Sequence, residues 1–252
     1  IPGLRAQQGV ELAGVANRTI ESSQTAVDKF ELGEAYPTWL HLIEDPEIDA
    51  ICIGTWPYMH STITLAALDN GKHVLCEARM SMNSLEARDM YAASVANPDL
   101  TTQIVPPPHL MACEKHLMDL IADGFIGEVV NVNIRVTDGS LYPDSDTEAH
   151  WRQMRELSGN NVMTTGIWYE NLMRLVGTAS SVSANAQIVV PYRRSWDGNR
   201  YPMTIPDQLD VIYSLAGGGS VNMTVTTVSG SFAPPTEIWI FGTEGTLRIE
   251  SN

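Results

Sequence analysis

The sequence predicts an α/β chain in two parts, a domain built on a parallel sheet over residues 1–106 and an α+β domain over residues 107–252. In the first part, short continuous apolar runs alternate with helical segments, which is typical of βαβ units. In the second part, apolar and polar residues alternate with period two, as in half-buried antiparallel strands. The triple proline Pro106–Pro108 is the clearest break between the two patterns.

In the first domain, apolar runs predict strands and the segments between them predict helices. Pro57 breaks the chain after the second strand, and Gly71 closes the helix that follows. Ser84 opens a further helix with N-cap and near capping-box spacing. The predicted strands are Val10–Arg18, Ile48–Thr55, His73–Glu77 and Thr101–Val105, and the predicted helices are Ser23–Lys29, His60–Gly71 and Ser84–Ala96.

The second domain is predicted to begin with a short amphipathic helix and to continue into the sheet. A long helix precedes most of the strands and ends at Gly177. The glycines at 217–219 form a turn between two strands. The predicted helices are Cys113–Gly124 and Asn161–Val176, and the predicted strands are Val129–Val136, Ser220–Val228 and a hairpin over Glu237–Glu250.

Composition excludes several classes of function. The formal net charge of −15 would repel phosphate backbones and anionic lipid, so neither nucleic acid nor a membrane surface is expected as a partner. Cys52, Cys76 and Cys113 form no CxxC pair, and Cys52 and Cys76 are expected to be small core residues. No set of His, Cys, Asp and Glu has metal-ligand spacing, so no metal is predicted.

Several motifs occur in an order that resembles the Gfo/Idh/MocA family of NAD(P)-dependent oxidoreductases, over essentially the whole chain. Each motif is weak alone, and their shared order makes the resemblance specific. The motifs are DAICIGTWPYMH, GKHVLCEARM, LIADGFIGEV, HWR, SGNNVMTTGIWYENLMRLVG and FGTEGTLRI.

The resemblance implies a Rossmann nucleotide-binding domain followed by an open, mainly antiparallel sheet that carries substrate residues and often the oligomer interface. The family's first strand and Gly-rich pyrophosphate loop are not in this sequence, so the Rossmann domain is expected to be truncated. We expect the sequence to be incomplete before Ile1, and at Asn252 as well, and to bind a dinucleotide poorly as written. A cytoplasmic location is the default expectation, with room for an export signal ahead of Ile1.

The end of the first predicted strand should meet the cofactor's ribose. NAD-binding proteins commonly place an acidic residue there, whereas this chain has Asn17, followed by Arg18 and Thr19. Loss of the carboxylate removes repulsion of a 2′-phosphate, and Arg18 can pair with that phosphate. The residues favour NADP and leave NAD open. The alternative is an Asn–Arg turn with a solvated Arg18.

Two further segments are implied to contact the cofactor. Thr55, Pro57 and His60 match the family's dinucleotide-contacting loop, although His60 could equally be an ordinary residue at the start of a helix. Glu77 matches the Glu of the family's Glu-Lys-Pro segment and is expected to face the nicotinamide ribose.

The family's proton-handling residues are replaced in this chain. Ala78 stands where the family has Lys, and Arg79 where it has Pro. Arg79 could orient an anionic or hydroxyl-rich substrate but cannot exchange a proton as a tuned Lys can, and a surface ion pair with Glu86 or Asp89 is its alternative. In the family's Asp-x-Gly-x-His pattern, this chain has Thr164 and Trp168 in place of Asp and His.

Other residues must then carry the proton. Tyr169 is the candidate nearest to the replaced His, with a hydrogen bond at a domain interface as the alternative role. His109, after the triple proline, and His150, in the HWR motif, are the other candidates. The predicted catalytic set is therefore Arg79, Tyr169, His109 and His150.

The resemblance favours an oxidoreductase that transfers hydride between NAD(P) and a small-molecule sugar, polyol or related hydroxyl or carbonyl compound. Two alternatives stay open: a dinucleotide-binding sensor or partner subunit without activity, and an NAD-assisted redox-neutral lyase or glycoside hydrolase. An uncovered sheet face is usually buried, so we expect a homodimer or homotetramer through the C-terminal sheet.

Overall fold

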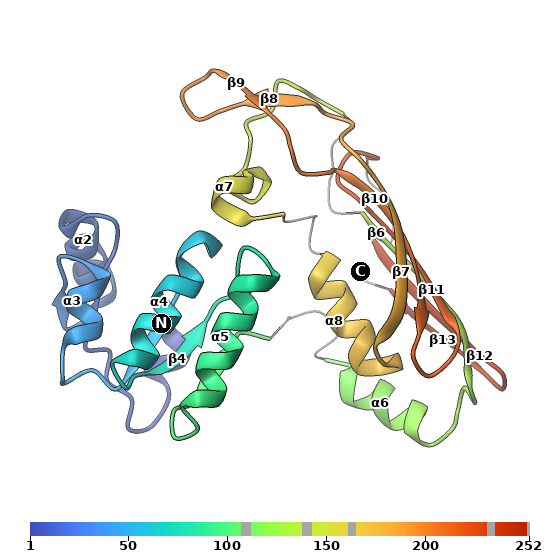
Figure 1. Cartoon of the computed structure of the whole chain (residues 1–252), viewed down its shortest axis with the longest axis horizontal. Helices are drawn as coiled ribbons and strands as arrows, with labels where there is room; N and C mark the ends of the chain where they lie inside the picture. The colour runs from blue at the N-terminus through green and yellow to red at the C-terminus, as the bar shows by residue number, and fades with distance from the viewer. Residues whose placement is uncertain (107–111, 138–142, 161–164, 231–234, 251–252) are drawn as a thin grey trace. The chain divides into compact units, whose positions relative to one another are not determined.

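The computed structural model describes residues 1–106, 112–137, 143–160, 165–230 and 235–250. The chain forms two compact units, Ile1–Val105 and Pro106–Asn252, each of which is described by itself (Figure 1). No helix within the described ranges is long and apolar enough to cross a membrane.

Unit 1 is built on parallel strands, as the sequence predicts. The strands β3 (Ala50–Ile53), β4 (His73–Cys76) and β5 (Thr102–Ile104) form a three-stranded parallel sheet in that order. A separate parallel pair joins β1 (Gly14–Val15) and β2 (Glu34–Ala35). The strands are shorter than the apolar runs that predict them, because only their central residues pair.

The helices of unit 1 begin at polar caps and bury an apolar stripe. Thr19, Thr38 and Asn83 accept hydrogen bonds from the first turns of α2, α3 and α5. The helices α4 and α5 lie side by side, and buried residues of β3, β4, α4 and α5 form one core (Figure 1). The helices are α1 (Pro2–Arg5), α2 (Ile20–Phe30), α3 (Trp39–Glu44), the 3₁₀ turn η1 (Pro57–Met59), α4 (His60–Asp69) and α5 (Ser84–Ala96).

One prediction about the core is wrong. Cys76 is buried, but Cys52 is exposed. Ile51 and Ile53 point from β3 into the core, so the alternation of the strand turns Ala50 and Cys52 to the opposite face, which the described residues leave open.

Unit 2 is built on a six-stranded sheet in the order β13-β12-β6-β11-β10-β7. Neighbouring strands are antiparallel except for β6 and β11, which run parallel. The strand β7 has no apolar alternation and was not predicted, because it lies at the sheet edge with mostly exposed residues. The strands are β6 (Val129–Thr137), β7 (Ala179–Gln187), β10 (Gln208–Leu215), β11 (Ser220–Thr226), β12 (Thr236–Gly242) and β13 (Thr246–Glu250).

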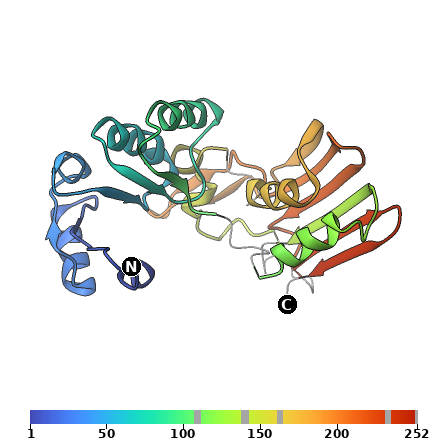
Figure 2. The same cartoon turned by 90° about the horizontal axis from the view of Figure 1, so that it is seen from below.

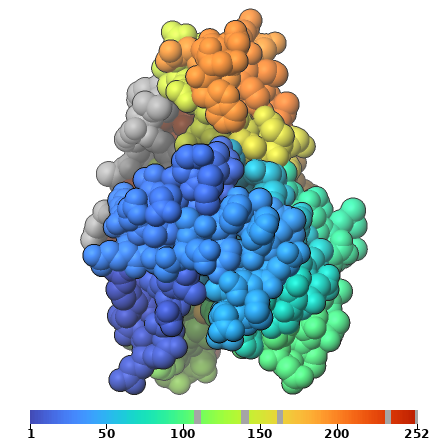
Figure 3. Space-filling view, turned by 90° about the vertical axis from the view of Figure 1, so that its left-hand side faces the viewer, coloured from blue at the N-terminus to red at the C-terminus, as the bar shows by residue number. Residues whose placement is uncertain are grey.

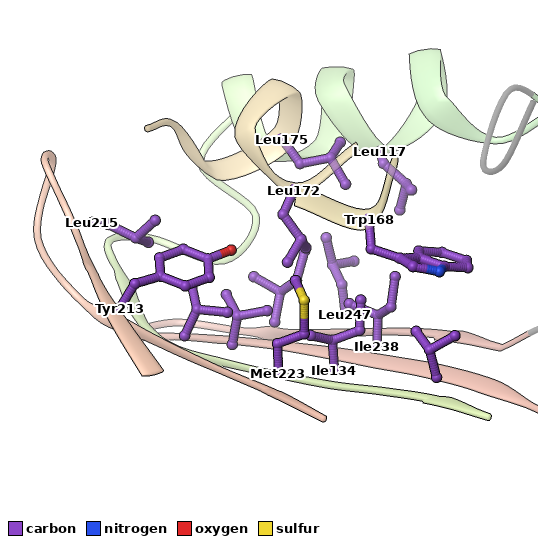
Figure 4. Packing of buried hydrophobic residues seen from close by; sticks show 14 of the residues in the cluster. Leu117, Ile134, Trp168, Leu172, Leu175, Tyr213, Leu215, Met223, Ile238 and Leu247 are labelled. Carbon is purple, nitrogen blue, oxygen red and sulfur yellow. The ribbon is translucent and has the colours of Figure 1, made fainter. Parts of the chain in front are cut away.

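Two helices cover one face of this sheet. Figures 1 and 2 both show α6 (Glu114–Ala122) and α8 (Thr165–Val176) on the same side of the strands. Their side chains point down onto the strands, where Trp168, Leu172 and Leu175 form the apolar stripe of α8 (Figure 4). The core of unit 2 lies between these two layers.

The other face of the sheet is mainly polar. Val221, Met223 and Val225 of β11 all point into the core. Their neighbours Asn222 and Thr224 point outward and hydrogen-bond to the adjacent strands. A stacked pair, Trp239 and Phe241, is the aromatic part of this face. An oligomer that used this face would therefore bury a largely hydrogen-bonding surface.

A small arm extends from the edge of unit 2 and was not predicted from the sequence. It joins the 3₁₀ turn η2 (Trp151–Gln153) and α7 (Arg155–Ser158) to the antiparallel hairpin of β8 (Tyr192–Arg194) and β9 (Arg200–Pro202). Ala149, Met154 and Met203 form its own small core. Figure 1 shows the hairpin in orange beyond the end of the sheet.

Replacing Val225 by Ala is expected to lower the free energy of unfolding by about 1.5–3 kcal/mol, because the side chain is 0% exposed in the sheet core. The matched control is Val182→Ala on β7, where the valine is 67% exposed and the change should stay within about 0.5 kcal/mol. Urea denaturation of both variants measures the difference. Equal losses would contradict the assignment of the core face.

Candidate functional site

The carboxyl ends of β3 and β4 meet at one edge of the parallel sheet. Ile53 and Cys76 are partners in the strand register, and the Glu77 amide donates to the Ile53 carbonyl at 2.9 Å. The chain after each strand therefore leaves the sheet at the same edge, where ligands bind in open α/β sheets. Parallel pairing brings Thr55 and Glu77 to this edge although they lie far apart in the sequence.

His60 joins the two loops that follow these strands. Its Nδ1 lies 2.7 Å from the Arg79 carbonyl oxygen and its Nε2 lies 2.9 Å from the Thr55 carbonyl oxygen. The residue is only 1% exposed. The buried ring therefore holds the loop after β3 against the loop after β4. Pro57 is buried beside it, at the start of η1.

The end of β4 presents charged groups next to this bridge. Glu77 is exposed, and its carboxylate oxygen Oε2 accepts a hydrogen bond from the Ala78 amide at 3.2 Å. Arg79 is half-buried, and its backbone carbonyl is the one that contacts His60. The Ala78–Arg79 peptide bond is cis. The Glu77 side chain is thus accessible to a hydroxyl-bearing ligand, with the Arg79 backbone fixed beside it.

The end of β1 forms a second cluster. The Asn17 amide donates to Ser23 Oγ at 2.8 Å, and its side-chain Nδ2 donates to the Ser22 carbonyl at 3.0 Å. Thr19 is the N-cap of α2. Both residues are therefore held by the first turn of α2, and this leaves the exposed Arg18 to project beyond them.

Arg18 connects this cluster to the loop after β3. Its guanidinium lies 4.8 Å from the ring centroid of Trp56. Such a contact fixes a flexible side chain and keeps its charge available. Trp56 follows Thr55, whose carbonyl contacts His60, so contacts link Asn17–Thr19 through Trp56 and His60 to Arg79. Sequence reasoning missed Trp56, although its place inside GTWPYMH is a signal that could have found it.

The contacts above bring Arg18, Glu77 and Arg79 to this edge as its charged residues. Arginine stays protonated at physiological pH and so cannot exchange a proton readily. Within the described ranges, no group of three or more His, Cys, Asp and Glu side chains could hold a metal ion. The edge therefore offers positive charge at Arg18, a carboxylate at Glu77 and rigid loops between them.

The predicted proton carriers of unit 2 lie in different places. The Tyr169 hydroxyl accepts a hydrogen bond from the Ala179 amide at 3.2 Å, and its ring packs edge-on against Tyr213. Burial and the neighbouring Tyr169 raise the pKa of Tyr213. Trp168 is 5% exposed in the core, which fits a packing role. His109 and Thr164 lie outside the described residues.

His150 lies on the arm. Its Nδ1 accepts a hydrogen bond from the Arg152 amide at 3.3 Å, and its backbone amide donates to Gln153. Burial and, to a lesser extent, the positive charge of Arg152 lower its pKa. The residue as a whole is exposed at the surface of the unit, although its ring is partly covered.

Comparison with known proteins agrees with this geometry. Residues 1–102 match the family described as "Oxidoreductase family, NAD-binding Rossmann fold". Residues 115–248 match the family described as "GFO/IDH/MocA C-terminal domain". The chain belongs to the GFO/IDH/MocA oxidoreductase family. The predicted family and the predicted fold class, a Rossmann domain followed by a mainly antiparallel sheet domain, are thus confirmed.

Relatives in the GFO/IDH/MocA family include both uncharacterised and named oxidoreductases. An uncharacterised oxidoreductase of Synechocystis sp. is 24% identical over 100% of this chain and 68% of its own length. The levoglucosan dehydrogenase of Pseudarthrobacter phenanthrenivorans is 23% identical over 92% of this chain and 63% of its own length.

A solved structure extends the comparison to three dimensions. Levoglucosan dehydrogenase in complex with NADH and L-sorbose aligns with a TM-score of 0.82 and 21% identity. The alignment covers 95% of this chain and 64% of that chain, so the sequence spans about two thirds of the length of its relatives. At this identity the structural likeness concerns the fold.

Replacing His60 by Phe is expected to lower the free energy of unfolding by about 1–3 kcal/mol, because the buried ring no longer contacts the Thr55 and Arg79 carbonyl oxygens. Dinucleotide affinity should fall as well, since the loops at Thr55 and Arg79 separate. Chemical denaturation and cofactor titration measure the two effects. His116→Phe, at an exposed position of α6, is the matched control and should change neither.

Replacing Arg152 by Gln is expected to raise the pKa of His150, although burial will still hold it below its ordinary value. An NMR titration of the His150 ring, assigned with a His150→Asn variant, measures the change. Because the folded-state pKa is depressed, His150 lowers stability as the pH falls through the ordinary pKa of histidine. Arg155→Gln is the control, and an equal shift in that variant would contradict the role of Arg152.

Proposed function

We propose that this protein is an NAD(P)-dependent oxidoreductase that acts on a hydroxyl or carbonyl group of a small sugar, polyol or related compound. The observation that carries the proposal is the linked edge of unit 1, where Arg18 stacks on Trp56 and His60 holds the loops of Thr55 and Arg79. A bound nicotinamide would supply the hydride acceptor or donor.

Different residues at this edge would bind different parts of the dinucleotide. Arg18, Asn17 and Thr19 would hold the adenosine ribose, and the absence of a carboxylate there favours NADP over NAD. Thr55 and Pro57 would contact the middle of the cofactor, and Glu77 would face the nicotinamide ribose. These residues would contact the adenosine ribose and the nicotinamide ribose at the two ends of a dinucleotide. The Gly-rich loop that binds the pyrophosphate in the family is not within this sequence.

The substrate would be oriented by positive charge rather than by the family's usual Lys. Arg79 would hold a hydroxyl-rich or anionic group, while His150, Tyr169 or His109 would receive or give the proton. His150 lies at an exposed position, and its Nδ1 lone pair accepts the Arg152 amide, so a neutral ring would carry its proton on Nε2 and could give that proton to a substrate. The Tyr169 hydroxyl would first have to leave its contact with Ala179.

We also propose that two or four copies associate through the C-terminal sheet, in a cytoplasmic setting. The outward side chains of β6, β11 and β12 would form this interface, with Trp239 and Phe241 at its aromatic end. Such an interface would be specified by hydrogen bonds at Asn133 and Asn222 more than by apolar area.

The direct test is turnover. The protein is incubated with oxidised NADP or NAD and with pooled sugars, polyols and hydroxy acids, and nicotinamide absorbance is followed. A rise supports the proposal, and His150→Asn, Tyr169→Phe and His109→Asn then identify the proton carrier. A flat trace with cofactor bound favours the inactive sensor, whereas product without net cofactor reduction favours the redox-neutral enzyme.

Arg18→Ala is expected to weaken NADP binding by about tenfold or more, because the 2′-phosphate loses a charge-assisted partner, and to weaken NAD binding much less. Asn17→Asp should shift preference toward NAD, since a carboxylate repels the 2′-phosphate. Fluorescence titration with NADPH and NADH measures both. Lys29→Ala removes a charge from the far end of α2 and serves as the control.

A further inference from the structure

The β8–β9 hairpin brings two like charges into direct opposition. Arg194 and Arg200 are cross-strand partners in its antiparallel register. Side chains directly opposite on one face lie about 4.5–5.5 Å apart at Cβ, and like charges in that position are destabilising. An anion bound by both arginines would offset this unfavourable charge interaction.

The described residues do not supply a carboxylate partner for these groups. None of the ion pairs within the described ranges involves Arg193, Arg194 or Arg200. The Arg194 Nε donates to the Asp146 backbone carbonyl at 2.5 Å. The Arg193 guanidinium contacts the Asp144 carbonyl and the Thr147 hydroxyl. The guanidinium groups of Arg193 and Arg194 thus contact neutral oxygens.

Three acidic side chains of the arm are occupied elsewhere. Asp197 accepts hydrogen bonds from Ser195 and Asn199 in the hairpin turn, and these bonds lower its pKa. Asp207 accepts the amides of Val189 and Val190. Glu156 accepts the Tyr201 hydroxyl at 2.9 and 2.8 Å. These carboxylates stabilise the arm's own loops.

A groove of about 450 Å³ lies over the arginines. Arg193 is 8% exposed, so it adds a nearly buried charge. The guanidinium carbon of Arg200 lies 3.5 Å from the ring centroid of Tyr192, which holds that group in place. Figure 3 shows the orange hairpin packed beside the lime-coloured chain that precedes η2. The lining residues are Ser145, Asp146, Pro191, Tyr192, Arg193, Arg194, Gly198 and Arg200.

We propose that this groove is an oxyanion-binding site, in which Arg194 and Arg200 together bind a phosphate or carboxylate group. Planar guanidinium groups match the geometry of both anions and bind them through paired hydrogen bonds. Asp146 also lines the groove, and its negative charge reduces the net positive charge there. The groove would therefore favour one small anion over a polyanion. The site lies on the arm of unit 2 and does not depend on the proposed dinucleotide function.

The oxyanion could come from a small molecule or from a second copy of this acidic chain. The first source is tested by isothermal titration with inorganic phosphate at constant ionic strength. Arg194→Gln and Arg200→Gln are each expected to weaken binding by about tenfold or more, because each removes a charge-assisted pair. Arg152→Gln removes the same charge from the same arm outside the groove lining and should leave binding within about twofold.

The second source is tested by sedimentation velocity at low ionic strength. If an acidic side chain of another copy is the ligand, wild type self-associates and the double variant Arg194→Gln/Arg200→Gln does not. Arg200→Lys keeps the charge and should retain part of either effect, which separates loss of the site from misfolding of the hairpin. Absence of both phosphate binding and arginine-dependent association overturns the proposal. An equal loss in Arg152→Gln overturns it as well, because attraction to the surface in general would then explain the binding.

Discussion

The candidate site depends on one buried side chain. His60 lies between the carbonyl oxygens of Thr55 and Arg79, which belong to loops that follow adjacent strands. The Glu77 amide pairs with the Ile53 carbonyl where the two strands end. Beyond that pair, the His60 ring contacts the carbonyls of both loops and so joins Thr55, the neighbour of Trp56, to Arg79.

The arrangement of charge follows from what each acidic or basic group contacts. Glu77 stays exposed at the sheet edge, whereas carboxylates such as Asp207 and Asp197 are used to satisfy backbone amides of loops. In a chain of net charge −15, this use of acidic groups leaves individual arginines as local centres of positive charge. Arg18 on Trp56 and Arg200 on Tyr192 are held by the same kind of contact with an aromatic ring.

Two of the positions discussed above carry side chains that do not titrate. Ala78 offers no titrating group, and Trp168 is part of the apolar stripe of α8. Arginine binds anionic groups without giving up a proton, which is the role proposed above for Arg79.

Local periodicity determined much of the architecture. Continuous apolar runs identified the parallel strands of unit 1 and placed Thr55 and Glu77 at their carboxyl ends, although β3 buries only the face that carries Ile51 and Ile53. Period-two alternation identified β6, β11, β12 and β13, and helical spacing identified the stripe of α8. In each case the spacing of apolar residues along the chain indicates which side chains are buried.

Only the tertiary structure decided which distant residues meet. The contact of Trp56 with Arg18, the bridge at His60 and the opposition of Arg194 and Arg200 depend on the path of the chain between segments. The polar strand β7 forms because β10 offers it an unpaired edge, and Cys52 is exposed because its face of β3 has no cover from the described residues. Such features arise from pairing across long separations, which no local pattern of hydrophobicity records.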